Sequence, residues 1–304
     1  MNKIMSLHAA VASIWDGQTL TFSGFGHGGH PMAFVRELIR QGHRGLTLNA
    51  VAECWPAEFL VGAGAVRAIN MSNLMFEGLG RCRAISRAIE TGSIMVDDHS
   101  HLGLSLRLLA AGWGVPFLPI RSMVGTDLAE VQTGKVTKYR CIASPFGEGD
   151  VGVVSALPTD VAVIHVHKCD EQGNGIVYGA RSVIDAQVRG ARRVIVTTEQ
   201  LVSADEIVSE NQLCVVPGFF VDAVVHTPFG AHPAGMYKLY VEDADHMARY
   251  YEASRDQATL RSYYREFVHG MHDEREYLQS LGSKRIFGLR VDPTLQFAPN
   301  RRAV

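Results

Sequence analysis

Apolar segments of strand length alternate with helical segments along most of the chain, and this alternation constrains the fold more than any other feature. The segments with the composition of strands are residues 20–23, 46–51, 161–164 and 193–197. Those with a helical pattern are residues 31–41, 81–90, 102–111 and 180–189. Strands that alternate with helices pair in parallel, and the helices cover both faces of the sheet. The sequence therefore predicts an α/β fold built on an open, mostly parallel sheet.

The periodicity changes to helical in residues 244–281. Apolar and aromatic side chains recur there at helical spacing among charged ones: Met247, Tyr250, Tyr251, Leu260, Tyr263, Tyr264, Phe267 and Tyr277. A stripe of this kind is more often core than ligand site. We expect a helical extension that packs on the sheet or on a partner. Because no linker interrupts the chain, residues 1–304 are predicted to form a single domain that includes this extension.

Charge and composition exclude several classes of partner. The 29 basic and 31 acidic side chains nearly balance, and no basic stripe favours a nucleic-acid partner. No apolar run reaches the roughly 18 residues that cross a bilayer, so no membrane partner is expected. The 5 cysteines are scattered without a paired motif, which is typical of reduced thiols in a cytoplasmic protein. The 13 histidines include no recognised ligand spacing, so no metal is expected.

A glycine-rich segment, residues 23–31, joins the first expected strand to the first expected helix. Its glycines permit positive φ and a close approach of the backbone to a ligand. The helix behind it presents unpaired N–H groups and a partial positive charge. Such a loop can hold a phosphate, a carboxylate or a developing oxyanion. A structural turn without a ligand is the alternative.

The same segment also matches a dinucleotide-binding pattern. Gly24, Gly26 and Gly29 have the required spacing, and Glu53 follows the next strand, where a ribose-binding acid would lie. However, His30 stands near the start of the helix, where that motif needs small residues. The residues alone leave the dinucleotide site, another anion site and the structural turn open.

Several further segments, in register, resemble the A-type subunits of glutaconate CoA-transferases, within family I of the coenzyme A transferases. They are residues 24–31, 115–119, 160–165, 216–225, 227–233, 276–278 and 281–282, with Asp170, Gly173, Asn174 and Gly179. The similarity runs from about residue 5 to residue 295. The resemblance implies an open α/β sheet and an active site shared with a B-type subunit, whose glutamate attacks an acyl-CoA. It implies no permanently bound cofactor, with coenzyme A as a substrate beside a small organic acid.

By this resemblance, the glycine loop is the part of the active site that this chain supplies, with its amides suited to a tetrahedral oxyanion. The residues concerned are Gly24, Phe25, Gly26, His27 and Gly28. The catalytic nucleophile is expected on the partner and not in this chain. Glu53 is a candidate acid lining the cleft, although capping a helix that starts at Pro56 is the favoured interpretation.

Other positions follow from the family's order of motifs. Residues 70–78 should border the acyl pocket, with Ser72, Asn73 and Glu77 binding substrate, and with Met75 and Phe76 suited to an apolar acyl part. CoA or subunit contacts are expected from Asn174, Gly179, Gly230 and His232. A hairpin-like turn at Asn174 is an equal alternative. Structural hydrogen bonds are favoured for His232.

The resemblance extends to steroid ring-cleaving hydrolases, whose A-type chain carries a working glutamate near the position of His101. A histidine can act as a general base near neutral pH. The favoured alternative is a helix cap at Asp98 or Ser100 with solvated histidines. Three functions therefore stay open: one half of a CoA-transferase, part of a hydrolase or carbon–carbon lyase acting on a cyclic CoA thioester, and a non-catalytic ligand-binding subunit.

Overall fold

The computed structural model describes residues 2–130, 138–147 and 149–294. Within them, a 9-stranded sheet contains a central run of parallel strands. Its order is β14 (Ala223–His226), β12 (Ala191–Leu201), β10 (Thr159–Cys169), β1 (Thr19–Phe22), β2 (Leu46–Ala50), β3 (Val66–Met71) and β6 (Met95–Asp98). The short strands β11 (Gly175–Ile176) and β13 (Cys214–Val216) continue antiparallel from the end of β10. The predicted open, mostly parallel sheet is confirmed.

Helices cover both faces of this sheet because successive strand residues point in opposite directions. Val161 and Val163 of β10 face a core that includes α1 (Leu7–Ala12), α2 (Met32–Gln41), α3 (Cys54–Gly62) and α4 (Arg83–Glu90). Ala162 and Ile164 face the opposite side and pack with α7 (Ile184–Gly190). Next to α7 lies α5 (His101–Trp113).

The predicted strands at 161–164 and 193–197 are the middles of longer strands, β10 and β12, and two predicted helices begin later than expected. Residues 180–183 form a turn before α7, since Ser182 has φ +46° and Gly179 has φ +82°. The expected helix at 81–90 begins at Arg83, because Gly80 and Arg81 form β5 and pair with β4 (Met75–Phe76). Both late helix starts come from local turn and hairpin geometry, which periodicity does not report.

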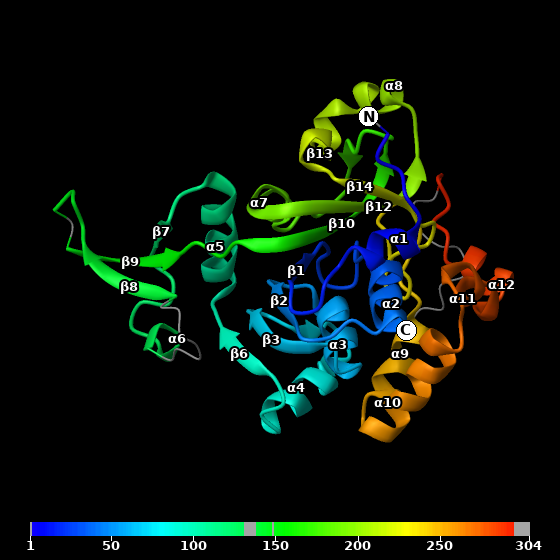
Figure 1. The fold of residues 1–304 in the computed structure, drawn as a ribbon, viewed down its shortest axis with the longest axis horizontal. Helices are drawn as coiled ribbons and strands as arrows, with labels where there is room; N and C mark the ends of the chain where they lie inside the picture. Colours follow the sequence, from blue (N-terminus) through cyan, green and yellow to red (C-terminus); the bar gives the residue numbers. More distant parts are fainter. Residues whose placement is uncertain (1, 131–137, 148, 295–304) are drawn as a thin grey trace.

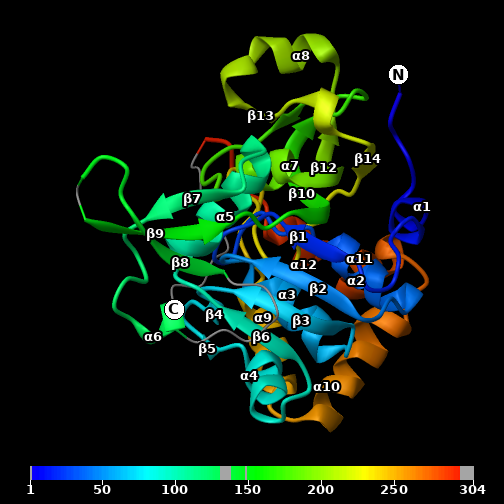
Figure 2. The ribbon, with the colours of Figure 1, turned by 60° about the vertical axis from the view of Figure 1, so that its left-hand side comes forward.

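The C-terminal part of the described chain is helical, as predicted, and continues past residue 281. It comprises α9 (Ala244–Ala253), α10 (Gln257–Tyr264), a π-helical turn η3 (Arg265–His269), α11 (Glu274–Leu281) and α12 (Ser283–Gly288). Figures 1 and 2 show α10 (orange) on the side of the sheet that carries α3 and α4. Most of its aromatic stripe is buried, including Tyr250 and Tyr277, which join the main core. The expectation that the stripe is core is confirmed.

A second, 3-stranded antiparallel sheet forms an arm that the sequence pattern did not predict. It consists of β7 (Phe117–Ile120), β9 (Asp150–Ser155) and β8 (Tyr139–Ala143). In both views it projects from the side opposite α10 (Figures 1 and 2). The remaining described helices are short: α6 (Asp127–Glu130), α8 (Ala204–Ser209), η1 (Asn211–Leu213) and η2 (Gly218–Phe220).

Candidate active site

The carboxyl ends of the parallel strands bring most of the predicted site residues to one edge of the sheet. The glycine loop follows β1, Glu53 follows β2, Ser72 follows β3, and His99 follows β6. Backbone hydrogen bonds join these ends, since the Ser72 amide donates to Ala50 O and the His99 amide donates to Met71 O. In open α/β sheets this edge is where ligands bind.

Gly24 and His30 fix the shape of the glycine loop. Gly24 has φ +121°, and a Cβ added there would lie 2.0 Å from Nδ1 of His30. The His30 ring is fully buried behind the loop and lies between two carbonyls, 2.8 Å from Gly26 O and 3.1 Å from Ser23 O. Burial lowers the pKa of His30 to about 4, so the ring is neutral at physiological pH. Gly24 is therefore required by packing as well as by its backbone angle.

The loop amides divide into two groups. The amides of Phe25 and Gly28 are paired with each other's carbonyls, at 2.9 and 3.0 Å. The amides of Gly24, Gly26 and His27 have no hydrogen-bond partner within the residues that the structure describes. Of the five loop amides predicted to be oxyanion donors, those of Phe25 and Gly28 are therefore used in hydrogen bonds within the turn. Of the remaining three, Gly24 and His27 are partly exposed, whereas Gly26 is buried.

His27 ties the loop to the segment after β3. The Trp55 indole N–H donates to Nδ1 of His27 at 2.9 Å, so Nε2 carries the proton and donates to Glu77 O at 2.6 Å. The carboxylate of Glu77 is also close, since a Cβ added at Gly26 would lie 3.0 Å from its Oε2. The structure therefore brings His27, Gly26 and Glu77 together. Both ring nitrogens of His27 are occupied, which leaves it a positioning role.

Glu53 occupies the N-cap position of α3, but its side chain does not cap the helix, so the favoured sequence interpretation is wrong. The helix begins at Cys54, two residues before Pro56, and the Glu53 side chain makes no capping hydrogen bond. The carboxyl is 1% exposed and accepts from the Ala52 amide at 3.0 Å and from Gln187 Nε2 at 3.2 Å. Burial raises the pKa of Glu53 to about 7. It is a buried acid beneath the strand ends.

The segment after β3 separates into surface and core. Asn73 and Glu77 are exposed, and Ser72 is half-buried with its hydroxyl donating to Val51 O. Met75 is exposed, but Phe76 is fully buried and packs at a tilt against Trp55 with ring centroids 4.4 Å apart. The expectation that Phe76 faces an acyl chain is therefore wrong, because the ring completes the core. Met75 and the three polar residues stay predictions.

The two histidines after β6 have different environments. Ser100 caps α5 through its hydroxyl, as expected, and His101 is exposed in the first turn. His99 is 3% exposed and lies 3.2 Å from the Asp97 carboxylate, so the expectation of a solvated histidine is wrong for it. Hydrogen bonds and ion pairs with His99 and Lys138 outweigh burial and lower the pKa of Asp97 to about 2. The resulting cluster holds the arm against β6.

Two pockets flank the glycine loop. A narrow one of about 90 Å³ is lined by Gly24, His165, His167 and Tyr178, among others. A larger one of about 580 Å³ extends from His27 along residues 235–242. Gly235 connects them, because its carbonyl accepts from the Gly29 amide at 3.0 Å and its amide donates to His27 O at 2.8 Å. These pockets give the loop a surface on which a ligand can lie.

Residues that sequence reasoning missed surround these pockets. Tyr237 and Lys238 are exposed beside the loop, and the segment that carries them pairs with it only through isolated bridges. Hydrophobic periodicity in the sequence does not predict contacts between a loop and such a segment. Gln187 had a signal, because it is a polar residue on the apolar face of a predicted helix, and it proves to be 1% exposed. For Trp55 the sequence contains no signal of a role at the site other than the size of its side chain.

The residues expected at the CoA or subunit contact are mostly engaged within the chain. Asn174 ends a hairpin turn between β10 and β11, where it binds Asp170 and accepts from the Gly218 amide at 2.8 Å. Buried His232 lies between Tyr277 and Asp243, so its predicted structural hydrogen bonds are present. Gly230 is buried, and its carbonyl accepts from the Ala33 amide. Only Gly179 is exposed next to the small pocket, against Tyr237.

A buried carboxylate joins the strand ends behind the small pocket. Oε1 of Glu199 lies 2.9 Å from Nε2 of His165 and accepts from the Tyr240 hydroxyl, and Oε2 accepts from the Phe229 amide at 2.6 Å.

Nowhere in the described part of the chain do three or more His, Cys, Asp or Glu side chains gather as a metal ion would need. Within the same residues, no helix has the length and apolar character required to cross a bilayer.

The chain is similar to subunits of several enzymes. The profile of the coenzyme A transferase family matches residues 4–227. The A subunit of glutaconate CoA-transferase from Acidaminococcus fermentans is 32% identical over 98% of this chain and 97% of that protein. The A subunit of 3-oxoadipate CoA-transferase from Pseudomonas knackmussii is 31% identical over 91% of this chain and 97% of that protein. The crystal structure of the A. fermentans glutaconate coenzyme A-transferase superposes with a TM-score of 0.93, at 30% identity and with 98% of each chain covered.

Two further relatives broaden the comparison. The cholesterol ring-cleaving hydrolase IpdA subunit of Mycobacterium tuberculosis is 26% identical over 93% of this chain and 99% of that protein. An uncharacterized protein of Archaeoglobus fulgidus is 35% identical over 98% of this chain, which spans 66% of that longer protein. The extent of the family match and the near-complete overlap in sequence and fold lead to one conclusion. The chain belongs to the coenzyme A transferase family and is of its A-subunit type.

Proposed function

We propose that this chain is the A-type half of a CoA-transferase that moves CoA between an acyl-CoA and a free carboxylic acid, with the nucleophilic glutamate on a B-type partner subunit. The observation that carries the proposal is the glycine loop, with three unpaired amides, among the described residues, at the ligand edge of the sheet. Backbone donors aimed at a developing oxyanion are a large source of acyl-transfer catalysis. Glu53, the nearby buried acid, is held by Ala52 and Gln187 and is not placed to attack a thioester.

The exposed side chains beside the loop support a partner at this edge. Phe25 is 48% exposed and Tyr237 is 61% exposed, while Lys238 adds a positive charge close to the Tyr237 ring. Aromatic residues are enriched at subunit interfaces and charged residues lie at their rims. In this proposal the partner covers Phe25 and Tyr237, and the intersubunit cleft includes the larger pocket beside His27.

The proposed reaction proceeds through two anhydrides and one thioester. The partner's glutamate attacks the acyl-CoA carbonyl, which breaks the C–S bond and gives an acyl–glutamyl anhydride and a CoA thiolate. The thiolate attacks the glutamyl carbonyl, which releases the donor carboxylate and leaves a glutamyl–CoA thioester. The acceptor carboxylate repeats these steps in reverse and departs as the new acyl-CoA. This is covalent catalysis by a carboxylate, for which ping-pong kinetics are expected.

For the substrate, we propose a dicarboxylic acid. Two of the relatives bear names that refer to such acids, glutaconate and 3-oxoadipate. Asn73 is exposed just after the end of β3, where its side-chain amide suits a distal carboxylate, while Ser72, whose hydroxyl donates to Val51 O, supports this segment. Met75 is 50% exposed and suits a carbon chain. We place the reaction in the cytoplasm, consistent with the 5 free cysteines.

A hydrolase or carbon–carbon lyase acting on a cyclic CoA thioester is the second candidate, favoured by the similarity to IpdA. This function requires a general base in this chain. The candidate is His101, which is exposed at the start of α5. A non-catalytic subunit that only binds the CoA ligand is the third. Both alternatives predict no CoA transfer to an acceptor acid.

Steady-state kinetics with the chain co-purified with its B-type partner test the proposal. We expect transfer that requires both chains and an acceptor acid, with parallel double-reciprocal plots when donor and acceptor are varied. Release of free CoA without an acceptor would instead support the hydrolase. Full turnover by this chain alone would contradict the shared site. The matched control is the partner with its proposed glutamate replaced by glutamine.

A further inference from the structure

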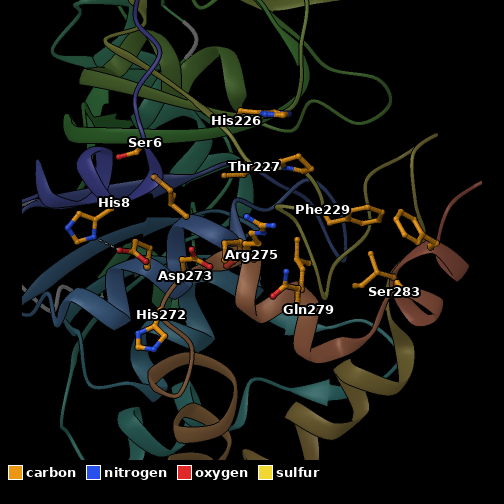
Figure 3. Close-up of a pocket in the computed structure, with 17 residues that line it drawn as sticks. Ser6, His8, His226, Thr227, Phe229, His272, Asp273, Arg275, Gln279 and Ser283 are labelled. Carbon is orange, nitrogen blue, oxygen red and sulfur yellow. Dashed lines mark hydrogen bonds and ion pairs between the residues drawn. The ribbon is translucent and has the colours of Figure 1, made fainter.

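A large hollow on the described surface lies apart from the glycine loop. It is a groove of about 830 Å³ between the start of α1, the segment after β14, and helices α11 and α12. Figure 3 shows these four parts of the chain around it, with Ser6 and His8 from α1, Thr227 and Phe229 after β14, and Arg275 from α11. Pockets of this size hold a small organic molecule. The catalytic proposal does not use this groove.

The walls of the groove are mostly apolar. Its apolar lining consists of Leu7, Pro228, Phe229, Leu278, Ile286 and Phe287. The Phe287 ring is 56% exposed although it packs edge-on to Phe229, with ring centroids 6.4 Å apart. Large apolar side chains left open to water in a concave site are typical of a ligand surface.

Two of the acids in the groove are paired with arginines, and the third caps a helix. Glu37 is paired with Arg40 and accepts from Gln41 at 2.7 Å, and Glu274 is paired with buried Arg36. Asp273 is the N-cap of α11. Each of these three acids therefore has a partner or a structural role within the chain.

Arg275, in contrast, is a charged residue of the lining whose side chain has no partner among the described residues. Arg275 is exposed on the first turn of α11 and makes no hydrogen bond, ion pair or ring contact through its side chain with any residue in the described part of the chain. In Figure 3 its side chain extends from α11 into the space below Thr227 and Phe229. Its guanidinium presents a fork of N–H donors that matches a carboxylate. An anionic ligand would supply the partner that this guanidinium lacks among the described residues.

A second polar group in the groove also lacks a partner. The Thr227 hydroxyl is buried, and among the described residues nothing bonds to it, although Thr227 lines the groove. Buried hydroxyls are nearly always hydrogen-bonded, so a bound molecule or an ordered water would complete this one. Thr227 and Arg275 come from separate elements, the end of β14 and α11, and both border the same space.

We propose that this groove binds an amphipathic carboxylate, a medium-chain fatty acid or the equivalent acyl group, as a site distinct from the transferase centre. The carboxylate pairs with Arg275, and the hydrocarbon chain lies along Phe229, Leu278 and Phe287. Short dicarboxylates do not fit this chemistry, because the described lining offers one unpaired arginine and a long apolar wall.

Calorimetric titration of the full-length chain with sodium octanoate tests this site. We expect saturable binding, with acetate and octanol binding at least tenfold more weakly because each lacks half of the recognised chemistry. Arg275→Gln is expected to weaken octanoate at least tenfold and to leave octanol unchanged. Arg261→Gln, on an exposed face of α10, is the matched control and should bind as the parent chain does.

A variant that fills part of the groove tests the site without changing its charge. Gln279 is exposed and lines the groove, so Gln279→Trp narrows the groove without disturbing the core. We expect it to weaken octanoate and octanol alike, and octanoyl-CoA is the arm that separates a free acid from a CoA-linked acyl group. Equal octanoate affinity in the parent, Arg275→Gln and Gln279→Trp chains would place the ligand elsewhere and overturn the proposal. The absence of saturable binding would overturn it as well.

Discussion

Replacing Glu53 by glutamine should make the chain more stable at neutral pH, and the gain should depend on pH. Burial raises the pKa of Glu53 from 4.5 to about 7, so the folded state binds a proton that the unfolded state has lost. An upward move of this size corresponds to a free-energy difference of about 3 kcal/mol. Glutamine has the shape of the neutral acid and cannot ionise.

The sign follows from proton linkage. Below pH 4.5 the carboxyl is protonated in both the folded and the unfolded state. The stability that the neutral carboxyl contributes is then fully present. As pH rises to about 7, the unfolded state releases its proton first, so stability falls. The free energy of unfolding of Glu53→Gln minus that of the parent chain should therefore rise by about 3 kcal/mol between about pH 4.5 and pH 8. Glu58, whose pKa burial also raises to about 7, is common to both chains and cancels.

Urea unfolding of the two chains near pH 5 and near pH 8 measures this difference. Glu266→Gln is a suitable control, because Glu266 is exposed and its pair with Arg249 lies on the surface, where such pairs contribute less than about 1 kcal/mol. A Glu53→Gln difference that does not change with pH would show that the carboxyl is ionised when folded. The argument from burial would then be wrong.

Three further outcomes are expected. Gly24→Ala should destabilise the loop by at least about 2 kcal/mol and abolish transfer, because its Cβ meets the His30 ring at 2.0 Å; Gly28→Ala, whose Cβ has no contact closer than 3.7 Å, should fold normally, and equal melting temperatures for the two would contradict the loop geometry. Glu274→Gln should lower the free energy of unfolding by about 3–5 kcal/mol, because Arg36 is left buried without its counter-charge; a loss no larger than that of Glu266→Gln would show that Arg36 is not desolvated. His101→Ala should leave CoA transfer within about twofold, whereas a general base would be worth roughly 10²–10⁴-fold; initial rates with the co-purified partner measure this.

The sequence predicted β1, β2, β10 and β12 of the main sheet, because these strands are mainly apolar segments separated by helices. Val161–Val163 and the residues around Leu20 carry that signal in their composition alone. The arm was missed because β7, β8 and β9 are short and half-exposed, and their pairing is with each other across intervening turns. Such strands lack both the apolar run and the helix between them.

The candidate site was predictable as a location but not in its contacts. The glycine loop was found because glycines at fixed spacing report backbone geometry directly. Glu53 was misassigned because an acid before a helix is usually a cap, and only its burial against Gln187 shows otherwise. Phe76 was misassigned because one aromatic residue in a polar segment does not reveal which way its ring turns. Its partner Trp55 lies 21 positions earlier on α3.

Trapping the covalent intermediate tests the shared active site most directly. The chain and its B-type partner would be incubated with acyl-CoA, reduced with borohydride and digested for peptide mass analysis. The account predicts one reduced glutamyl residue on the partner, none on this chain, and no trapping without CoA thioester. A reduced residue at Glu77 or any other acid of this chain, or turnover without a trapped glutamyl thioester on the partner, would contradict it.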